Sequence, residues 1–266
     1  MTNSQWIDAH CHLADQRLET HVDQFITEAE KLGVGFFMQG GVGPEDWQSQ
    51  MDLAVRFPGK IGLCFGLHPY WVADHDEDLC EIALDSLAPI LPKALGIGEM
   101  GLDFRPNIMK DSRERQIEVF ENQLELAEAI QKPMVLHLVQ AHEQAIRIMD
   151  VWGVPAAKGL VHSFNSNWGK AEDFLNRGLY LSLGGPVVWP QNEKLHQVVK
   201  LMPLEYLLLE SDSPDQPPPR FKQSLNQPAS VWDVAAKIGE LREMPTNDVL
   251  DLATQNFKRL FRYDRK

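Results

Sequence analysis

Two histidines, His10 and His12, lie one residue apart at the end of a short apolar run near the start of the sequence. If that run forms a β-strand, side chains two residues apart point to the same face of the strand. The two imidazoles then lie side by side, and such a pair can bind a metal ion. His-x-His spacing also arises often by chance, so the interpretation depends on whether the chain supplies further ligands.

Further metal-binding side chains follow other apolar runs of the chain in the same way. They are Glu99, His137, His162 and Asp212. Each one alone has an ordinary explanation, as a core histidine, a loop acid or a turn residue. Because all of them share one position at the ends of apolar runs, we interpret them, with the first pair, as one metal site.

Four histidines and two carboxylates exceed the needs of one catalytic zinc ion, which takes three protein ligands and keeps a fourth position open. We therefore predict two divalent cations about 4 Å apart. One cation takes His10, His12 and Asp212. The other takes His137 and His162, and the glutamate of the set bridges the two. The mixture of imidazole and carboxylate suits zinc, manganese or iron and tolerates magnesium.

Two such ions can activate a water molecule and hold an ester oxygen at the same time. The predicted catalytic residues are Glu99, as the bridge, and Asp212, as an acceptor for the proton of that water. The ligand set therefore predicts a metal-dependent hydrolase of ester bonds.

Elements that bring these side chains together can be predicted from the alternation of apolar runs with helix-type segments. The eight β-type runs span residues 5–10, 34–39, 61–66, 94–98, 133–137, 158–162, 179–183 and 206–210. Eight βαβ-type units in 266 residues predict a closed (β/α)8 TIM barrel, an α/β fold, as a single domain over residues 1–266. An open doubly wound sheet is the alternative, but no glycine-rich phosphate motif follows the first run. In a barrel the carboxyl ends of all strands meet at one face, where the ligands converge.

Helices are predicted over residues 44–56, 111–131, 228–243 and 246–262. At the start of the 111–131 helix, Asp111 and Glu114 have the spacing of a capping pair, and Pro133 separates the helix from the next strand. The one long loop, 213–227, is rich in proline and follows the last strand. Long loops in compact domains are often functional.

The chain is acidic, with 25 Lys and Arg against 38 Asp and Glu and a formal net charge of −13. Such a surface has no general attraction for nucleic acid or for an anionic membrane. Local positive charge must therefore bind any phosphate-ester substrate, and metal ions are its obvious source.

Cellular context is indicated by the cysteines and by the absence of apolar segments. Cys11, Cys64 and Cys80 are odd in number and lack CxxC spacing, which fits a reducing cytoplasm. Residues 1–5 do not resemble a signal peptide, and no apolar run is long enough to span a bilayer. We therefore expect a cytoplasmic protein without membrane contact or stable protein partner. Cys11 should face away from the metals and pack in the core.

Several motifs, in this order and at this spacing, resemble the TatD family of metal-dependent hydrolases over nearly the whole chain. They are Asp8-Ala9-His10-Cys11-His12-Leu13, Gly66-Leu67-His68-Pro69, Gly98-Glu99-Met100-Gly101-Leu102-Asp103, Arg115-Gln116, Val161-His162-Ser163-Phe164, Glu210-Ser211-Asp212-Ser213-Pro214 and Gln255-Asn256-Phe257. Residues 209–215 are most similar to the YjjV-like branch of that family.

The resemblance implies a TIM barrel of the amidohydrolase type with a divalent metal site. It implies the ligand roles given above, and it places His68 on the substrate side of the metals. It also implies phosphoesterase chemistry on a phosphate-ester or nucleic-acid substrate, with deoxyribonuclease activity in some members.

Three departures from the family pattern concern residues around the substrate rather than the metal ligands. Leu138 and Val139 replace the usual Ser-Arg, Gln227 replaces an acid, and Asp215 replaces an aromatic residue. A cation that could bind phosphate is therefore missing after the fifth strand. These changes weaken the case for DNA as the substrate more than the case for hydrolysis. Arg105 is the predicted substrate-binding cation, and Arg220 and Lys222 are further candidates.

Two other functions remain open on the sequence. One is an amidohydrolase that cleaves a C–N bond or a lactone; many such sites use a carbamylated lysine after the fourth strand, and no lysine lies between Leu95 and Arg105. The other is a metal-binding scaffold without turnover, against which the intact ligand set argues.

Overall fold

The computed structural model describes residues 6–263, whose strands build a parallel barrel. A first ladder pairs β1 (Trp6–Cys11), β2 (Val34–Gln39) and β3 (Ile61–Gly62). A second ladder continues in chain order through β4 (Cys64–Phe65), β5 (Gly96–Asp103), β6 (Met134–Val139), β7 (Gly159–Val161), β8 (Tyr180–Leu183) and β9 (Leu207–Leu209). Because β3 and β4 flank Leu63, they share one of eight barrel positions.

Hydrogen bonds close the ring between β1 and the segment that follows β9. The Asp212 amide donates to the His10 carbonyl at 3.0 Å. The buried Asp8 carboxylate accepts from the Ser211 amide at 2.9 Å and from the Ser211 hydroxyl at 2.5 Å. The predicted (β/α)8 barrel is therefore confirmed.

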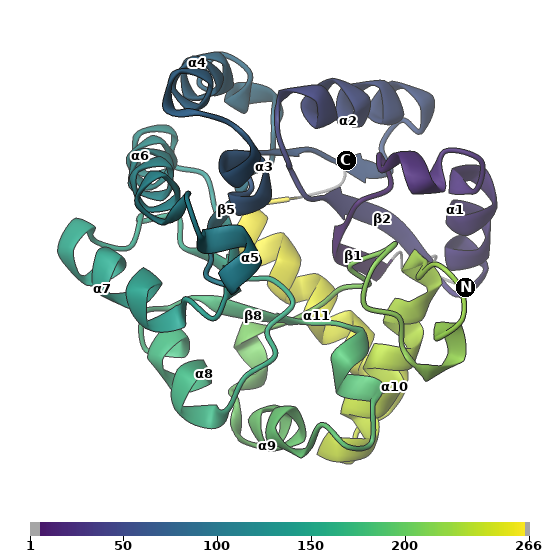
Figure 1. The fold of residues 1–266 in the computed structure, drawn as a ribbon. Helices are drawn as coiled ribbons and strands as arrows, with labels where there is room; N and C mark the ends of the chain where they lie inside the picture. Colours follow the sequence, from purple (N-terminus) through teal and green to yellow (C-terminus); the bar gives the residue numbers. More distant parts are fainter. Residues whose placement is uncertain (1–5, 264–266) are drawn as a thin grey trace.

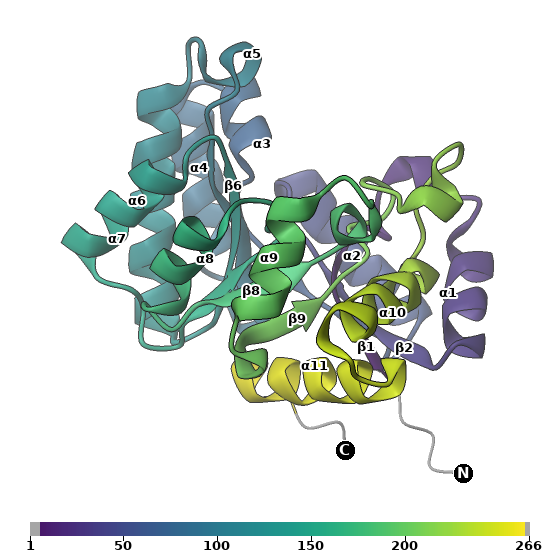
Figure 2. The same cartoon turned by 90° about the horizontal axis from the view of Figure 1, so that it is seen from below.

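Helices surround the barrel (Figure 1). In chain order they are α1 (Val22–Lys31), α2 (Pro44–Arg56), α3 (Pro69–Asp74), α4 (Glu77–Leu87), α5 (Pro106–Met109), α6 (Arg113–Ile130), α7 (His142–Trp152), α8 (Trp168–Leu175), α9 (Glu193–Leu201), α10 (Val231–Arg242) and α11 (Thr246–Phe261). Short 3-10 segments are η1 (Gln16–Leu18), η2 (Leu91–Lys93), η3 (Gly185–Val188), η4 (Leu204–Tyr206), η5 (Pro219–Phe221) and η6 (Pro228–Ser230). Figure 2 shows α11 lying across one end of the barrel, opposite α5.

Apolar side chains fill the end of the barrel that α11 covers. Ile7, Phe36 and Leu208 from the strands form one buried cluster with Phe257 and Phe261 of α11. The ring centroids of Phe36 and Phe257 are 5.9 Å apart. Burying each of these side chains contributes roughly 1.5–3 kcal/mol. The amino-terminal end of the barrel is thereby closed, and the polar residues collect at the other end.

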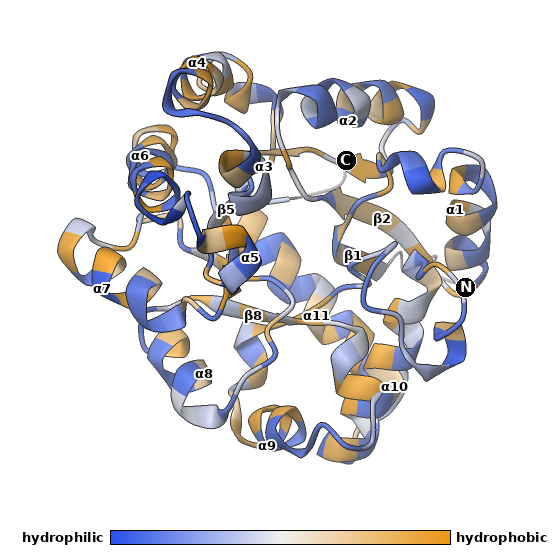
Figure 3. Cartoon of the chain, in the orientation of Figure 1, coloured by the Kyte–Doolittle hydropathy of each residue, from blue (hydrophilic) through white to orange (hydrophobic). Residues whose placement is uncertain are grey.

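The main core lies between the strands and the outer helices. Figure 3 shows hydrophobic and hydrophilic residues alternating along these helices, as expected where one face is buried. In α1, for example, the buried residues are Val22, Phe25, Ile26 and Ala29. Within residues 6–263, no helix is long and apolar enough to cross a membrane.

Most predicted strands are observed within two residues of their expected bounds, and the fourth is the main error. The sequence predicted a strand over 94–98 that ends before Glu99, whereas β5 continues to Asp103 and is buried throughout. Glu99 therefore lies within the strand, because the chain after this acid stays buried. Gln5, the first residue of the first predicted run, lies outside the described residues.

The predicted cap of the 111–131 helix is wrong. The helix, α6, begins at Arg113, and no side chain caps its first turn. The Ser112 hydroxyl at the cap position donates to the Ile108 carbonyl, and Glu114 accepts from Arg113 instead. Among the other predicted helices, 44–56 is observed as α2, 246–262 as α11, and 228–243 divides into η6 and α10.

Candidate metal centre

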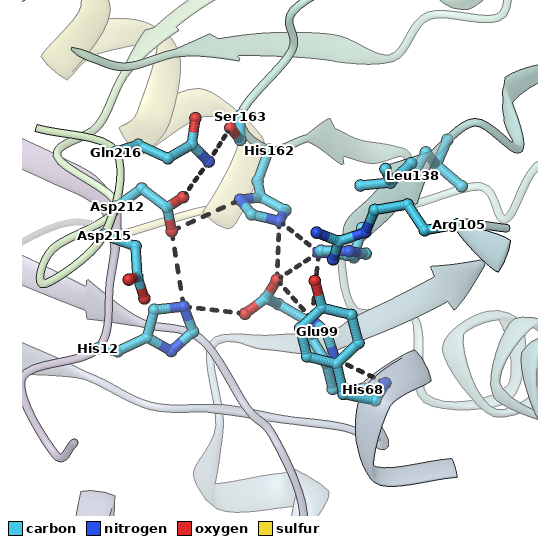
Figure 4. Close-up of a pocket in the computed structure, with 13 residues that line it drawn as sticks. His12, His68, Glu99, Arg105, Leu138, His162, Ser163, Asp212, Asp215 and Gln216 are labelled. Atoms are coloured by element: carbon cyan, nitrogen blue, oxygen red, sulfur yellow. Dashed lines mark hydrogen bonds and ion pairs between the residues drawn. The ribbon is translucent and has the colours of Figure 1, made fainter. Parts of the chain in front are cut away.

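All predicted ligands converge at the carboxyl-terminal end of the strands. Figure 4 shows the side chains that line the resulting cavity. The ligands come from β1 and the residue after it, from β5 and β6, and from the turns after β7 and β9; they are His10, His12, Glu99, His137, His162 and Asp212.

Glu99 lies at the centre of the cluster, and its two oxygens face different histidines. Oε1 lies 3.1 Å from His12 Nε2 and 3.3 Å from His10 Nε2. Oε2 lies 2.7 Å from His162 Nε2 and 3.3 Å from His137 Nδ1. One carboxylate therefore connects two groups of imidazoles, as a bridge between two cations requires.

Asp212 completes the group around Glu99 Oε1. Its Oδ1 lies 3.7 Å from His10 Nε2 and 3.6 Å from His12 Nε2. The same oxygen lies 4.0 Å from His162 Nδ1, so Asp212 also reaches the edge of the other group. Asp212 thus lies nearest the first pair of histidines, and it also shares a candidate ligand set with His10 and His162.

His68, predicted on the substrate side, lies against the group around Glu99 Oε2. Its Nε2 is 3.1 Å from His137 Nδ1 and 3.7 Å from Glu99 Oε2. Its Nδ1 accepts from the Tyr70 amide at 3.0 Å. Burial and the neighbouring His137 lower the pKa of His68 well below its usual 6.5, so the ring is neutral.

Polar atoms left without hydrogen bonds indicate that the cluster fits metal ions. His10 Nδ1 and Nε2, Glu99 Oε1 and His162 Nδ1 are buried and make no hydrogen bond. Orphaned buried polar atoms are rare in proteins and costly, typically about 1–3 kcal/mol each. Three candidate sets each combine two histidines with one carboxylate, and within each set the ligand atoms lie within 4.8 Å of one another. Divalent cations satisfy such a donor set.

Gly40 has no side chain, and the cluster occupies the space that a side chain at this position would fill. A Cβ at this position lies 2.5 Å from His10 Cε1, 2.7 Å from His12 Cε1 and 2.7 Å from Glu99 Oε1. Real Cβ atoms do not approach other atoms so closely. A glycine at the end of β2 is therefore required for these three side chains to meet.

Burial and neighbouring charges shift the pKa values of several side chains in the cluster, and these shifts affect metal binding. Burial lowers the pKa of His10 to about 4, which keeps this imidazole in its ligand form. Burial opposes ionisation of Glu99, but the histidines around it, His162 first, hold its pKa well below the usual value. Burial also opposes the charged form of His137, but hydrogen bonds with Asp103 and Glu99 raise its pKa to about 9. A metal must displace that proton, so metal affinity depends on pH.

Asp103 supports His137, a role that the sequence did not predict. Its Oδ2 lies 3.3 Å from His137 Nε2, on the side of the ring away from Glu99. A carboxylate that accepts from the outer nitrogen of a histidine orients the ring and makes the inner nitrogen a better ligand. The sequence prediction missed Asp103 because it ended the fourth strand at residue 98. A strand that continues to Asp103 places this acid beside the cavity.

Asp103 also holds Arg105, the predicted substrate-binding cation. The Arg105 guanidinium donates from Nε at 3.0 Å and from Nη2 at 2.7 Å to this carboxylate. It lies 5.0 Å above the ring centroid of Tyr70. Its side chain is 38% exposed and faces the cavity, so it remains able to bind an anion.

A cavity of about 450 Å³ lies over the cluster. Besides His68 and the candidate ligands other than His10, its walls include Tyr70, Arg105, Leu138, Val139, Ser163, Asp215 and Gln216. Leu138, Val139 and Asp215 thus border the cavity as their departure from the family pattern predicted. Sequence reasoning assigned no role to Tyr70 or Gln216, because Tyr70 lies in the short helix α3 and Gln216 in the loop after β9, and neither segment has a periodic signal.

Arg220 and Lys222 do not line this cavity. Arg220 pairs with Asp233 at 3.1 Å, and Lys222 lies 5.6 Å from the ring centroid of Trp189. Cys11 is fully buried in the main core, where its thiol donates to the Met38 carbonyl at 3.5 Å. Its predicted packing role is confirmed.

Comparison with known proteins identifies the family. The model of the TatD related DNase family matches residues 7–262. The uncharacterized metal-dependent hydrolase YabD of Bacillus subtilis (strain 168) is 32% identical over 255 residues, which cover 96% of this chain and 98% of YabD. These matches span almost the full barrel.

Solved structures agree. The crystal structure of YjjV, a TatD homolog from Escherichia coli K12, matches with a TM-score of 0.90 at 27% identity, covering 99% of this chain and 100% of that one. The Escherichia coli phosphotriesterase homology protein, complexed with phosphate in its active site, matches with a TM-score of 0.68 at 15% identity over 98% of this chain and 100% of that one, which shows a shared fold only. The expected resemblance, including its likeness to YjjV, is confirmed. The chain belongs to the TatD family of metal-dependent hydrolases.

Proposed function

We propose that this hydrolase uses two divalent cations to cleave phosphate esters with water. The observation that supports this most strongly is the division of the Glu99 carboxylate, whose oxygens lie 3.1 Å from His12 and 2.7 Å from His162. His10, His12, Glu99 and Asp212 would hold one ion, and His137 and His162, with Glu99, would hold the other.

Zinc, manganese and magnesium are the proposed candidates for both positions, given four imidazoles and two carboxylates in the set. When bound, two such ions lower the pKa of a water molecule and stabilise the charge that develops on the phosphoryl oxygens. The chain then has to orient the substrate, remove a proton from the water and exclude competing reactions.

Asp212 is the proposed proton acceptor. Burial opposes its ionisation, but a hydrogen bond with His12 and the charges of the neighbouring histidines keep its pKa below the usual value. The carboxylate is therefore ionised, as a general base must be. Its position beside both groups of ligands supports this role.

His68 is the proposed donor to the substrate. Its Nδ1 accepts from the Tyr70 amide, so in the neutral ring Nε2 carries the hydrogen. That nitrogen points into the ligand cluster, 3.7 Å from Glu99 Oε2. A neutral imidazole N–H in this position can donate to a phosphoryl oxygen without adding charge to the metal site.

Arg105 is the proposed phosphate-binding cation and compensates for the arginine missing beside Leu138. Its guanidinium is held rigid by Asp103 and by the face of Tyr70. A guanidinium held this way retains free N–H groups that match a phosphate. Leu138 and Val139 give the adjacent wall an apolar surface suited to an apolar ester group.

The rim of the cavity favours small phosphate esters over DNA. Asp215, which lines the cavity, and Asp15 both accept from Arg17, each at 2.7 Å, so this group carries one more acid than base. The formal net charge of −13 adds to the repulsion of a polyanion. Deoxyribonuclease activity is therefore proposed as the secondary activity, and we expect it to be weaker than hydrolysis of a small diester.

The test is a substrate panel on purified protein with added Mn²⁺, Mg²⁺ or Zn²⁺. It compares an aryl phosphate monoester, an aryl phosphodiester, single-stranded DNA, a lactone and a cyclic amide. We expect metal-dependent cleavage of the phosphate esters that EDTA abolishes. His137→Ala should remove it, whereas His21→Ala should not, because His21 precedes α1 and does not line the cavity.

The panel also tests the alternatives. Cleavage of the lactone or the cyclic amide in place of any phosphate ester would make the protein an amidohydrolase. Among the described residues, no lysine lines the cavity, so the site lacks the carbamylated bridge that many such enzymes use. Absence of turnover with every metal and every substrate would leave only the metal-binding scaffold.

A further inference from the structure

Gln216 makes two contacts inside the cavity that neither the ligand set nor the proposed chemistry uses. Its side-chain nitrogen donates to Asp212 Oδ2 at 2.5 Å and also contacts the Ser163 hydroxyl. Figure 4 shows this amide lying between the two residues, with its nitrogen toward both. Both hydrogens of the amide nitrogen are therefore engaged within the protein.

The contact with Gln216 gives the two oxygens of the Asp212 carboxylate different partners. Oδ1 faces His10 and His12 at 3.7 and 3.6 Å, in the ligand cluster. Oδ2 is turned away from these histidines and accepts from Gln216. An aspartate without such a donor can rotate about its last torsion, which is broad and nearly two-fold, and exchange its oxygens.

Ser163 gives the contact a second consequence, because it directly follows the ligand His162. Gln216 therefore connects the turn after β7 with the turn after β9. The Ser163 backbone is fixed as well, since its amide donates to the buried Glu210 at 2.5 Å. One amide thus links the two loops that carry His162 and Asp212.

Hydrogen bonds also hold the backbone around Gln216 in place, and they fix the position from which its side chain extends. The Asp215 amide donates to the Asp212 carbonyl at 2.9 Å, which forms a turn. The Asn226 side chain donates to the Asp215 carbonyl at 2.8 Å, and Trp189 donates to the Pro217 carbonyl at 3.2 Å. A Cβ on Gly185 would lie 1.9 Å from the Gln216 carbonyl oxygen, so this segment packs directly against η3.

We propose that Gln216 is a positioning residue, which holds Asp212 with Oδ1 toward the metal ions and fixes the distance between the Asp212 and His162 loops. The proposal rests on the metal site of the proposed function and adds a residue that acts on it through Asp212. Partners that orient metal ligands in this way typically contribute 10–100-fold to metal affinity or activity.

Direct contact with substrate is the competing role for Gln216, because the residue lines the cavity. The two roles differ in what they change. A positioning residue affects metal affinity and kcat, whereas a substrate-binding residue affects KM and leaves metal affinity as it was. The geometry favours positioning, since the amide hydrogens are already used by Asp212 and Ser163.

The experiment compares Gln216→Met with Gln223→Met. Methionine keeps the length of the side chain but removes the donor, and Gln223 is an exposed glutamine on the same loop. Ser163→Ala is the second variant, because it removes one anchor of the amide and leaves the bond to Asp212. Each metal-stripped protein is titrated with Mn²⁺ by calorimetry, its thermal unfolding is recorded, and kcat and KM for an aryl phosphodiester are measured at saturating Mn²⁺.

For Gln216→Met we expect roughly 10–100-fold weaker Mn²⁺ binding at one site, a lower kcat and a KM within about threefold of the wild type. Ser163→Ala should show a smaller change of the same kind, and Gln223→Met should match the wild type. Mn²⁺ affinity and kcat both unchanged in Gln216→Met would overturn the proposal, as would a rise in KM alone. If the wild type cleaves no phosphate ester, the proposed function fails, while the Mn²⁺ titration still decides the role of Gln216.

Discussion

Glu99 Oε2 lies 2.7 Å from Nε2 of His162, although Glu99 lies in β5 and His162 directly follows β7, which is not a neighbour of β5 in the barrel. The other oxygen of the same carboxylate lies 3.1 Å from His12 Nε2 and 3.3 Å from His10 Nε2. Because Glu99 is almost fully buried, neither oxygen can turn to water for a partner. This arrangement supports the proposal that the carboxylate holds a cation on each side.

Replacing Glu99 with glutamine tests this bridge. The amide keeps the size of the side chain but offers one oxygen, so it cannot join two cations. We expect the metal content to fall from two ions per chain to one or none, and hydrolysis to be lost with it. Elemental analysis of dialysed protein measures the metal content. Glu240→Gln, an exposed change, is the control, and two retained ions in Glu99→Gln would contradict the bridging role.

Asp103 and Arg105 can be separated by a matched pair of variants. Asp103→Asn removes the charge that orients His137 and also frees Arg105, whereas Arg105→Gln removes only the cation. We expect Asp103→Asn to lower metal affinity by roughly 10–100-fold. Arg105→Gln should leave metal affinity unchanged and raise KM for phosphate esters. Mn²⁺ titration and steady-state kinetics distinguish the two, and equal metal affinity in both variants would show that Asp103 does not act through His137.

Gly40→Ala places a methyl group 2.5 Å from His10 Cε1. We expect loss of metal binding and a decrease in the free energy of unfolding of about 1–3 kcal/mol, the usual cost of an overpacked site. Chemical denaturation and elemental analysis measure both quantities. Gly169→Ala is the control, because its Cβ meets only Asn167 Oδ1 at an ordinary 3.5 Å. It should keep both metals, and normal metal content in Gly40→Ala would mean that the cluster is looser than the structure shows.

Cys11→Ala tests the orientation of β1. The thiol lies in the main core and contacts the Met38 carbonyl, so we expect a loss of about 1 kcal/mol in the free energy of unfolding. Metal content should not change, because the side chain points away from His10 and His12. Loss of metal in this variant would show that the strand presents a different face to the site.

The convergence of the six candidate ligands could be predicted from the sequence because its signal is positional. Each ligand follows an apolar run, and in a parallel barrel the ends of such runs converge whatever the exact helix boundaries are. His137 and Asp212 were therefore found, although the β-strand bounds differ from the predicted ones by up to two residues at those positions.

Residues that act through a neighbour were not predictable in this way. Asp103 was missed because the strand was ended at the first acid, Glu99, and only burial of the following residues shows that β5 continues. Gln216 lies in a proline-rich loop with a left-handed backbone, at a φ of 51°, which no periodic pattern specifies. Arg220 was a reasonable candidate for phosphate, but Asp233 of α10 pairs with it away from the cavity.

The most direct test of the two-metal account is a crystal structure of the protein grown with Mn²⁺ and measured at the manganese absorption edge. We expect two anomalous peaks, one on each side of the Glu99 carboxylate, with His10 and His12 at one and His137 and His162 at the other. A single peak, or two peaks that do not share Glu99, would contradict the account.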